Sequence, residues 1–199
     1  MYKTKKVSEF LTEEEARLML SQPDQRTAEG KRDGAVLALM LTTGLRKAEL
    51  CSLKVSSIKE YRNQKVLDVI GKGHKFRRIA LRPDVYEMIT KYHKAIGNGH
   101  DPESPLFFTL NKNGLWGKRG LTFCAVDFLV RKYAGLAMIQ KRVTPHTMRH
   151  TFATTLLGKG VDLKTVSELC GHSNMQVTEV YCHSSEDRKF EAVWKLNFN

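Results

Sequence analysis

The chain has 199 residues and carries 33 Lys and Arg against 21 Asp and Glu, a formal charge of +12. This length fits one domain with a good hydrophobic core, and the charge favours a polyanionic partner, nucleic acid first, over a small neutral substrate. No signal peptide and no apolar run long enough to cross a bilayer is visible, which argues against a membrane protein and predicts a cytoplasmic one.

The N-terminal part is predicted to be helical. Thr12, followed by three glutamates that end at Glu15, is a capping box and opens a helix through Leu20. Residues 21–31 are polar and rich in helix breakers and are interpreted as a loop. The next helix, from about residue 32 to 43, is apolar on nearly all sides, as expected of a buried central helix. Gly44 can end it in the left-handed conformation.

A new helix begins at Leu45, and it carries Arg46 and Glu49 three residues apart. The two side chains could form an ordinary ion pair on a helix surface. Equally, the stretch could have a functional role, in which Glu49 pairs with Arg46 or braces the neighbouring turn beside a buried element. The residues of this stretch alone leave both interpretations open.

Residues 65–81 change to short β-branched runs that are interrupted by Gly71-Lys72-Gly73-His74, which predicts a β-hairpin with Lys72 at its tip. Such a lysine can reach into a site or simply solvate the turn. Pro83 then opens a helix to about residue 96. Residues 98–120 are predicted to be mostly loop around a buried anchor at 106–108, and a helix follows from about residue 122 to 133.

Thr144-Pro145 is typical of a helix start and puts His146 and Arg149 in the first turn, on one face. That face suits an anionic oxygen ligand such as a phosphate, although a cap and a surface ion pair would give the same pattern. A short helix then runs to Gly171, which His172 follows. Tyr181 comes nine residues later, either as a nucleophile or as an amphipathic residue at the edge of the core.

The four cysteines show no Cys-x-x-Cys pair and no ligand spacing with histidine, so neither a zinc site nor a disulfide framework is expected. We predict one mainly helical domain with a small antiparallel β-sheet, an α+β fold. It comprises residues 1–199, with a core over about 8–183 and an apolar tail helix over 184–199.

The polar groups at helix starts and turn tips are, in order, Arg46, Lys72, His146, Arg149, His172 and Tyr181. With Thr43–Leu50 (TGLRKAEL), Gly71–Gly73 (GKG), His146–His150 (HTMRH), Gly171-His172 and the final tyrosine, the chain resembles the catalytic domain of tyrosine recombinases, the phage integrase family. The resemblance implies that fold. It also implies cutting and rejoining of DNA through a 3′-phosphotyrosine, with no nucleotide cofactor and no metal.

The resemblance assigns a role to each group. Tyr181 would be the nucleophile, and His146 would accept or share its proton. Arg46 and Arg149 would neutralise the charge that develops on the phosphate. Lys72 would protonate the leaving 5′-oxygen, and His172 would donate a hydrogen bond to the phosphate. Glu49 and His150 would hold Arg46 and the helices of the site in place.

The expected partner is double-stranded DNA. The protein would be a monomer when free and would form a homotetramer on two DNA sites, during integration, excision or inversion of a mobile element. Candidate DNA contacts come from the clusters of positive charge: Lys75, Arg77, Arg78, Lys118, Arg119, Lys141 and Arg142.

Two alternatives remain from the sequence, a non-catalytic DNA-binding accessory factor of the same fold and a type IB topoisomerase. The complete set of six polar residues argues against a pure binder, and the short chain with Gly171-His172 favours a recombinase over a topoisomerase. The N-terminal domain usual in this family is absent from this chain. The chain would therefore be a fragment or a single-domain member that resembles the short DNA invertases.

Overall fold

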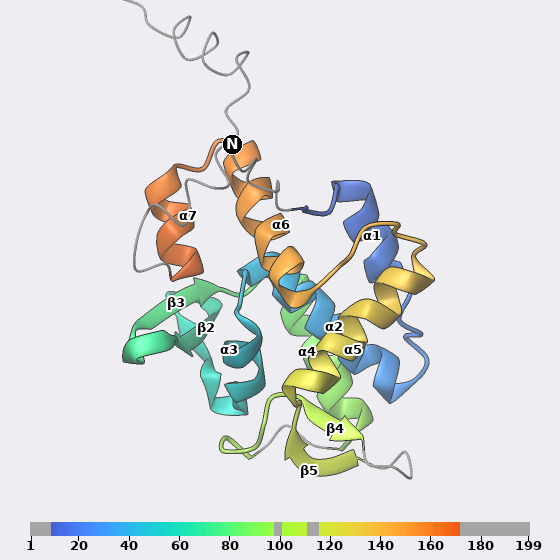
Figure 1. The fold of residues 1–199 in the computed structure, drawn as a ribbon. Helices are drawn as coiled ribbons and strands as arrows, with labels where there is room; N and C mark the ends of the chain where they lie inside the picture. Colours follow the sequence, from blue (N-terminus) through green and yellow to red (C-terminus); the bar gives the residue numbers. More distant parts are fainter. Residues whose placement is uncertain (1–8, 98–100, 111–115, 172–199) are drawn as a thin grey trace, which may run out of the picture.

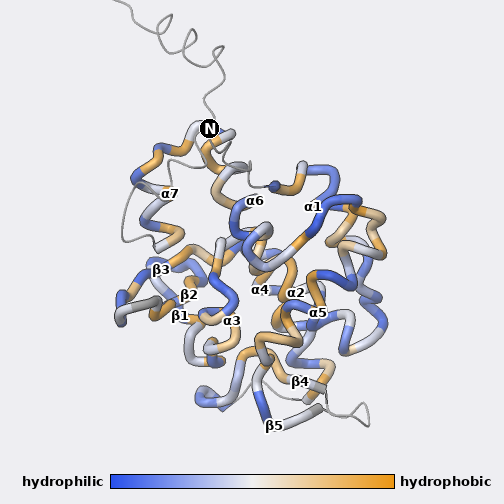
Figure 2. Tube along the Cα trace, viewed as in Figure 1, coloured by the Kyte–Doolittle hydropathy of each residue, from blue (hydrophilic) through white to orange (hydrophobic). Residues whose placement is uncertain are grey.

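The helix α2, Ala28–Thr43, is the centre of the fold in the computed structural model, which describes residues 9–97, 101–110 and 116–171. It is buried on both faces from Ala35 to Met40, as its continuous apolar sequence predicts. It contacts α1 (Glu13–Ser21), α4 (Pro83–Ala95) and α6 (Pro145–Gly158) (Figure 1). Figure 2 shows hydrophobic segments gathered where the central helices meet.

The first two helix starts are decided by threonine caps. At α1 the predicted capping box is confirmed, because Thr12 Oγ1 accepts from the Glu15 amide at 3.1 Å and Glu15 Oε2 accepts from the Thr12 amide at 2.7 Å. The predicted start of α2 was four residues too late. Thr27 Oγ1 accepts from the Gly30 amide at 2.9 Å and caps the helix earlier.

Gly44 ends α2 with φ of +61°, as predicted, and α3, Lys47–Ser52, follows with Arg46 as its N-cap. A three-stranded antiparallel sheet comes next, in the order β1-β2-β3, with β1 at Ile58–Tyr61, β2 at Gln64–Ile70 and β3 at Phe76–Ala80. The predicted β2–β3 hairpin is confirmed, and its tip is a single turn of 3₁₀ helix, η2, at Lys72–His74. The edge strand β1, preceded by the short η1 at Val55–Ser57, was not predicted.

The region predicted to be loop contains a second sheet, in which β4, Phe108–Leu110, pairs with β5, Trp116–Gly120. Its anchor is confirmed, since Leu106, Phe107 and Phe108 are buried. The helix α5 runs over Phe123–Leu136, and α7 runs over Leu163–Cys170 and ends at Gly171 with φ of +64°. Figure 1 shows α7 next to both β3 and α6.

The sequence prediction of a mainly helical fold with antiparallel strands is confirmed, with two small sheets in place of one. Within the described ranges, no helix combines the length and the hydrophobicity that a membrane crossing requires.

Candidate active site

Three arginines from three different elements bind the C-terminal end of α7. Arg77 Nε on β3 donates to the carbonyl of Leu169 at 2.9 Å, and Arg46 Nη2 at the start of α3 donates to the carbonyl of Gly171 at 2.8 Å. Arg149 Nη2 on α6 donates to the carbonyl between them, that of Cys170. The last carbonyls of a helix have no partner within the helix and form its negative end. Three consecutive carbonyls thus gather three guanidinium groups in one place.

The carboxylate of Glu49 joins two of these arginines. Its oxygens accept from Arg77 Nη1 and Nη2, each at 2.8 Å, and from Arg46 through the amide at 2.7 Å and Nη1 at 3.0 Å. Only 4 % of the Glu49 side chain is exposed. Burial alone would raise the pKa of Glu49, but the hydrogen bonds from Arg77 and Arg46 outweigh it and hold this pKa below its usual value.

The N-terminal part of α6 carries His146 and Arg149. Thr144 Oγ1 caps this helix by accepting from the Thr147 amide. The Arg149 side chain is buried and also donates from Nη1 to the carbonyl of Gly44 at 2.6 Å. His146 lies on the exposed part of the turn. Desolvation of its ring, helped by the positive charge of Arg149, lowers the pKa of His146, so that the neutral imidazole is favoured.

The tip of the hairpin lies directly on the Glu49–Arg77 pair. A methyl group built on Gly71 would be 3.1 Å from Glu49 Oε1 and 3.3 Å from Arg77 Nη1. The Gly71 amide donates to the carbonyl of Lys75 at 2.8 Å and closes the turn. Lys72, for which the structure describes the backbone, comes next in the chain. The sequence motifs around residues 46, 72, 149 and 171 therefore meet in space.

Two of the six predicted catalytic residues, His172 and Tyr181, lie outside the described residues, and so does the predicted tail helix at 184–199. His150, predicted to support the site, is buried on α6, and its ring packs nearly perpendicular to that of Phe10 with centroids 5.7 Å apart. It thus contacts the segment before α1.

The residues predicted to bind DNA differ in what they contact. Lys75, Arg119 and Arg142 are exposed. Arg78 pairs with Asp68 across the hairpin at 2.7 and 2.9 Å, and Lys141 binds Glu15 at 2.7 Å and the Phe10 carbonyl at 2.6 Å. For Lys118 the structure describes the backbone.

Arg77, also predicted to contact DNA, is instead enclosed by the protein. Its side chain is 11 % exposed, and each of its three guanidinium nitrogens donates to the protein itself. The alternation of side chains along the strand indicates this burial. Arg77 is two residues from the buried Ile79 and opposite the buried Val69, so its side chain lies on the buried face of the sheet.

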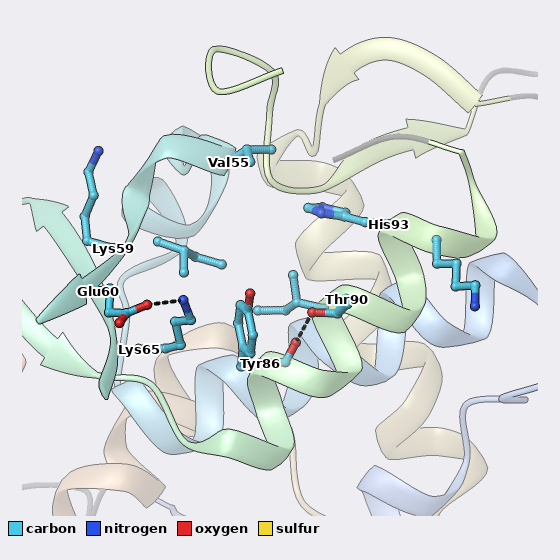
Figure 3. Close-up of a pocket in the computed structure, with 10 residues that line it drawn as sticks. Val55, Lys59, Glu60, Lys65, Tyr86, Thr90 and His93 are labelled. Carbon is cyan, nitrogen blue, oxygen red and sulfur yellow. Dashed lines mark hydrogen bonds and ion pairs between the residues drawn. The ribbon is translucent and has the colours of Figure 1, made fainter. Parts of the chain in front are cut away.

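The structure also contains a pocket of about 420 Å³ between α4 and the strands β1 and β2 (Figure 3). Three lysines, Lys59, Lys65 and Lys94, line it, and Lys65 pairs with Glu60 at 2.8 Å. None of the predicted catalytic residues within the described ranges lines this pocket. In the part of the chain that the structure describes, no group of three His, Cys, Asp or Glu side chains could hold a metal ion.

Comparison with known proteins gives concordant matches. The model of the phage integrase family matches residues 9–188. A tyrosine recombinase XerC of Bacillus pumilus is 37 % identical over 188 residues, which are 92 % of this chain and 59 % of the relative. A tyrosine recombinase of Pseudothermotoga lettingae is 35 % identical over 192 residues, 96 % of this chain and 62 % of that protein. The chain thus spans about three fifths of the length of these curated relatives.

Solved structures show the same fold. The crystal structure of XerA recombinase superposes with a TM-score of 0.75 at 23 % identity, over 99 % of this chain and 67 % of that one. The XerH site-specific recombinase in a pre-cleavage complex with its difH substrate superposes with a TM-score of 0.76 at 25 % identity, over 97 % of this chain and 56 % of that one.

Proposed function

Because the chain belongs to the phage integrase family, whose matched relatives are tyrosine recombinases, we propose that it cuts and rejoins DNA at specific sites through a 3′-phosphotyrosine intermediate. In this proposal Tyr181 attacks the scissile phosphate and releases a 5′-hydroxyl. Attack of a new 5′-hydroxyl on the phosphotyrosine then restores a phosphodiester and frees the tyrosine. The bond energy is kept at each step, so the exchange needs no nucleotide cofactor.

The observation that supports the proposal best is the convergence of Arg46 and Arg149 on the neighbouring carbonyls of Gly171 and Cys170. These two arginines are 103 positions apart in sequence, so their proximity is a product of the fold. Two guanidinium groups side by side can bind the non-bridging oxygens of one phosphate and stabilise the charge that builds up on attack. The Arg46 side chain keeps 34 % of its surface exposed and can meet such a ligand.

The remaining roles in the proposal follow residue type. His146, whose neutral form is favoured, would accept or share the proton of Tyr181. Lys72 would protonate the 5′-oxygen as it leaves, and His172 would donate a hydrogen bond to the phosphate. Glu49 would fix Arg46, and His150 would hold α6 in place. The exposed cations Lys75, Arg119 and Arg142 are the proposed contacts to the DNA backbone.

The proposal extends to assembly and place. A chain that is a monomer when free would form a homotetramer on two DNA sites, because exchange between two duplexes needs four strands cut by four tyrosines. It would meet its DNA in the cytoplasm, at the nucleoid. Exchange of strands between two duplexes, measured against relaxation of a single supercoiled circle, separates a recombinase from a topoisomerase.

The decisive experiment captures the covalent intermediate. A library of random-sequence duplexes with nicks at random positions is incubated with the chain, since a nick near the cut lets the released short strand diffuse away and traps the phosphotyrosine. Protein-linked DNA is then recovered under denaturing conditions and sequenced, which also identifies the site. We expect the adduct from the natural chain and none from Tyr181→Phe, which should keep DNA affinity within a few-fold because the hydroxyl adds little to the phosphate contacts. An adduct that persists in Tyr181→Phe would contradict the assignment.

A further inference from the structure

Arg77 connects three of the segments that form the candidate active site. It belongs to β3, five residues after Lys72 on the strand that leaves the hairpin tip. Its Nη1 and Nη2 bind both oxygens of Glu49 on α3, and its Nε binds the Leu169 carbonyl on α7. One planar guanidinium thus holds a strand, a helix start and a helix end together.

The geometry uses the arginine fork completely. A bidentate pair fixes the orientation of a carboxylate as well as its position, and the third nitrogen points away from that pair toward a separate acceptor. A lysine ammonium is a point charge and cannot reproduce the two parallel bonds. Arg77 is also enclosed, because methyl groups built on Gly71 and Gly171 would lie 3.3 Å and 3.0 Å from its Nη1.

Glu49 transmits this constraint to the proposed catalytic arginine. The Glu49 oxygens held by Arg77 are the same atoms that accept from the amide and Nη1 of Arg46. Without Arg77 the buried Glu49 carboxylate would lose two of its four hydrogen bonds and could turn. The end of α7, which also accepts from Arg46 and Arg149, would lose its tie to the hairpin.

We propose that Arg77 is a positioning residue for DNA cleavage, which acts through Glu49 and the end of α7 to hold Arg46 in place, and that it is not a DNA contact. The inference rests on the proposed function. This role replaces the DNA contact that the charge clusters suggested, because all three guanidinium nitrogens of Arg77 donate to acceptors within the protein. Arg77→Ala should therefore lower the cleavage rate of bound DNA and leave the salt dependence of binding unchanged.

The test uses a nicked duplex recovered with the natural chain. Adduct formation is followed in a single turnover at saturating protein, and affinity for the same duplex is measured between about 50 and 200 mM salt, so that binding and cleavage are separated. For Arg77→Ala we expect a cleavage rate lower by on the order of 10²-fold, as for other small displacements of a catalytic group, at an unchanged salt slope. Arg77→Lys should not restore the rate.

The matched control is Arg82→Ala. Arg82 is also an arginine in a bidentate pair, with Asp84 at 3.0 and 2.9 Å, but its side chain is 63 % exposed and contacts none of the predicted catalytic residues in the described structure. This variant should cleave bound DNA at the natural rate. Thermal unfolding of all variants shows whether each is folded at the assay temperature. If Arg77→Ala is not folded, the comparison is made on Arg77→Lys alone.

Natural cleavage rates in both Arg77 variants would overturn the inference. A shallower salt slope with a natural rate for bound DNA would also overturn it and would assign Arg77 to DNA binding. Recovery of the rate by Arg77→Lys would show that the charge alone matters and would overturn the positioning role. Absence of any adduct with the natural chain, by contrast, would contradict the proposed function itself.

Discussion

Glu49 organises the cations of the candidate site. A carboxylate taken out of water is costly unless its partners are close and well oriented, and here four donors from two arginines surround it. The sequence left two interpretations for the Arg46–Glu49 spacing, a surface pair or a brace for a functional arginine. Because Glu49 is buried and Arg46 binds the end of α7, the pair is not an ordinary surface ion pair. Arg77 could not be found from this spacing, because it lies 28 positions further along the chain.

The protonation of the His146 imidazole gives a prediction for a single residue. Desolvation and then Arg149 lower its pKa from the ordinary 6.5, so the ring stays neutral to a lower pH than a free histidine and is protonated only below that pH. In an NMR titration of the free protein, the signals of this ring should have a midpoint below pH 6.5, with His146→Gln used to assign them. In Arg149→Lys the positive charge is kept, so the midpoint should stay low. A midpoint at or above 6.5 in the natural chain would contradict the assigned surroundings.

The elements that the sequence predicts best are those with a local chemical signal. Thr12, Thr122 and Thr144 accept hydrogen bonds from amides of the first turns of α1, α5 and α6, which begin where we predicted. The start of α2 was missed because glycine usually disfavours a helix, and Gly30 lies in its first turn. A methyl group there would be 2.0 Å from the Asp24 carbonyl oxygen, so glycine is required where the preceding loop packs against the helix.

The strands that we missed lack such a signal. Along β1 all but the first residue are exposed, so the strand shows no alternation of apolar and polar residues. The strand β5, Trp116–Gly120, has a glycine at 117 and another at 120, which favours a loop on sequence grounds. Pairing with β4, a contact between distant residues, decides its structure.

The turn that ends α7 gives a prediction at the scale of an element. Gly171 has φ of +64°, and a methyl group there would be 3.0 Å from Arg77 Nη1 and 3.4 Å from Arg46 Nη1. Gly171→Ala should lower the stability by about 1–2 kcal/mol for the left-handed backbone. It should also slow adduct formation, because the Arg77 guanidinium must shift and is joined to Arg46 through Glu49. Thermal unfolding and single-turnover cleavage measure the two effects.

Gly97→Ala is the control for that experiment. Gly97 has the same φ of +64°, and no atom of the described residues lies within 4 Å of the place that its methyl group would take. Its replacement should therefore carry the backbone cost alone and leave cleavage unchanged. Equal cleavage rates in the two variants would show that the arginines tolerate the methyl group and that the end of α7 does not position them.

At the scale of the whole molecule, core and site are built from the same elements. The helix α2 packs against α6, and Gly44, which ends α2, accepts a hydrogen bond from Arg149 on α6. A methyl group on Gly44 would be 2.3 Å from a ring carbon of Phe152. From the order and spacing of its motifs, the sequence predicted that Arg46 and Arg149 would lie close together, and they bind neighbouring carbonyls. It did not predict that they would gather on the carbonyls of α7, because backbone acceptors leave no mark in a sequence.

The last prediction concerns the charge of the whole chain. A protein of +12 that neutralises about six phosphates of duplex DNA releases their counterions, so the logarithm of its affinity should fall with the logarithm of salt concentration with a slope of about −5. Fluorescence anisotropy on a random-sequence duplex of about 30 base pairs measures this slope.

Lys75→Ala, at an exposed position beside the hairpin tip, should make the slope shallower by about 1 if it removes one phosphate contact. Arg77→Ala should leave it unchanged, because that guanidinium is bonded to Glu49 and Leu169. Binding that does not respond to salt would contradict an electrostatic DNA interface.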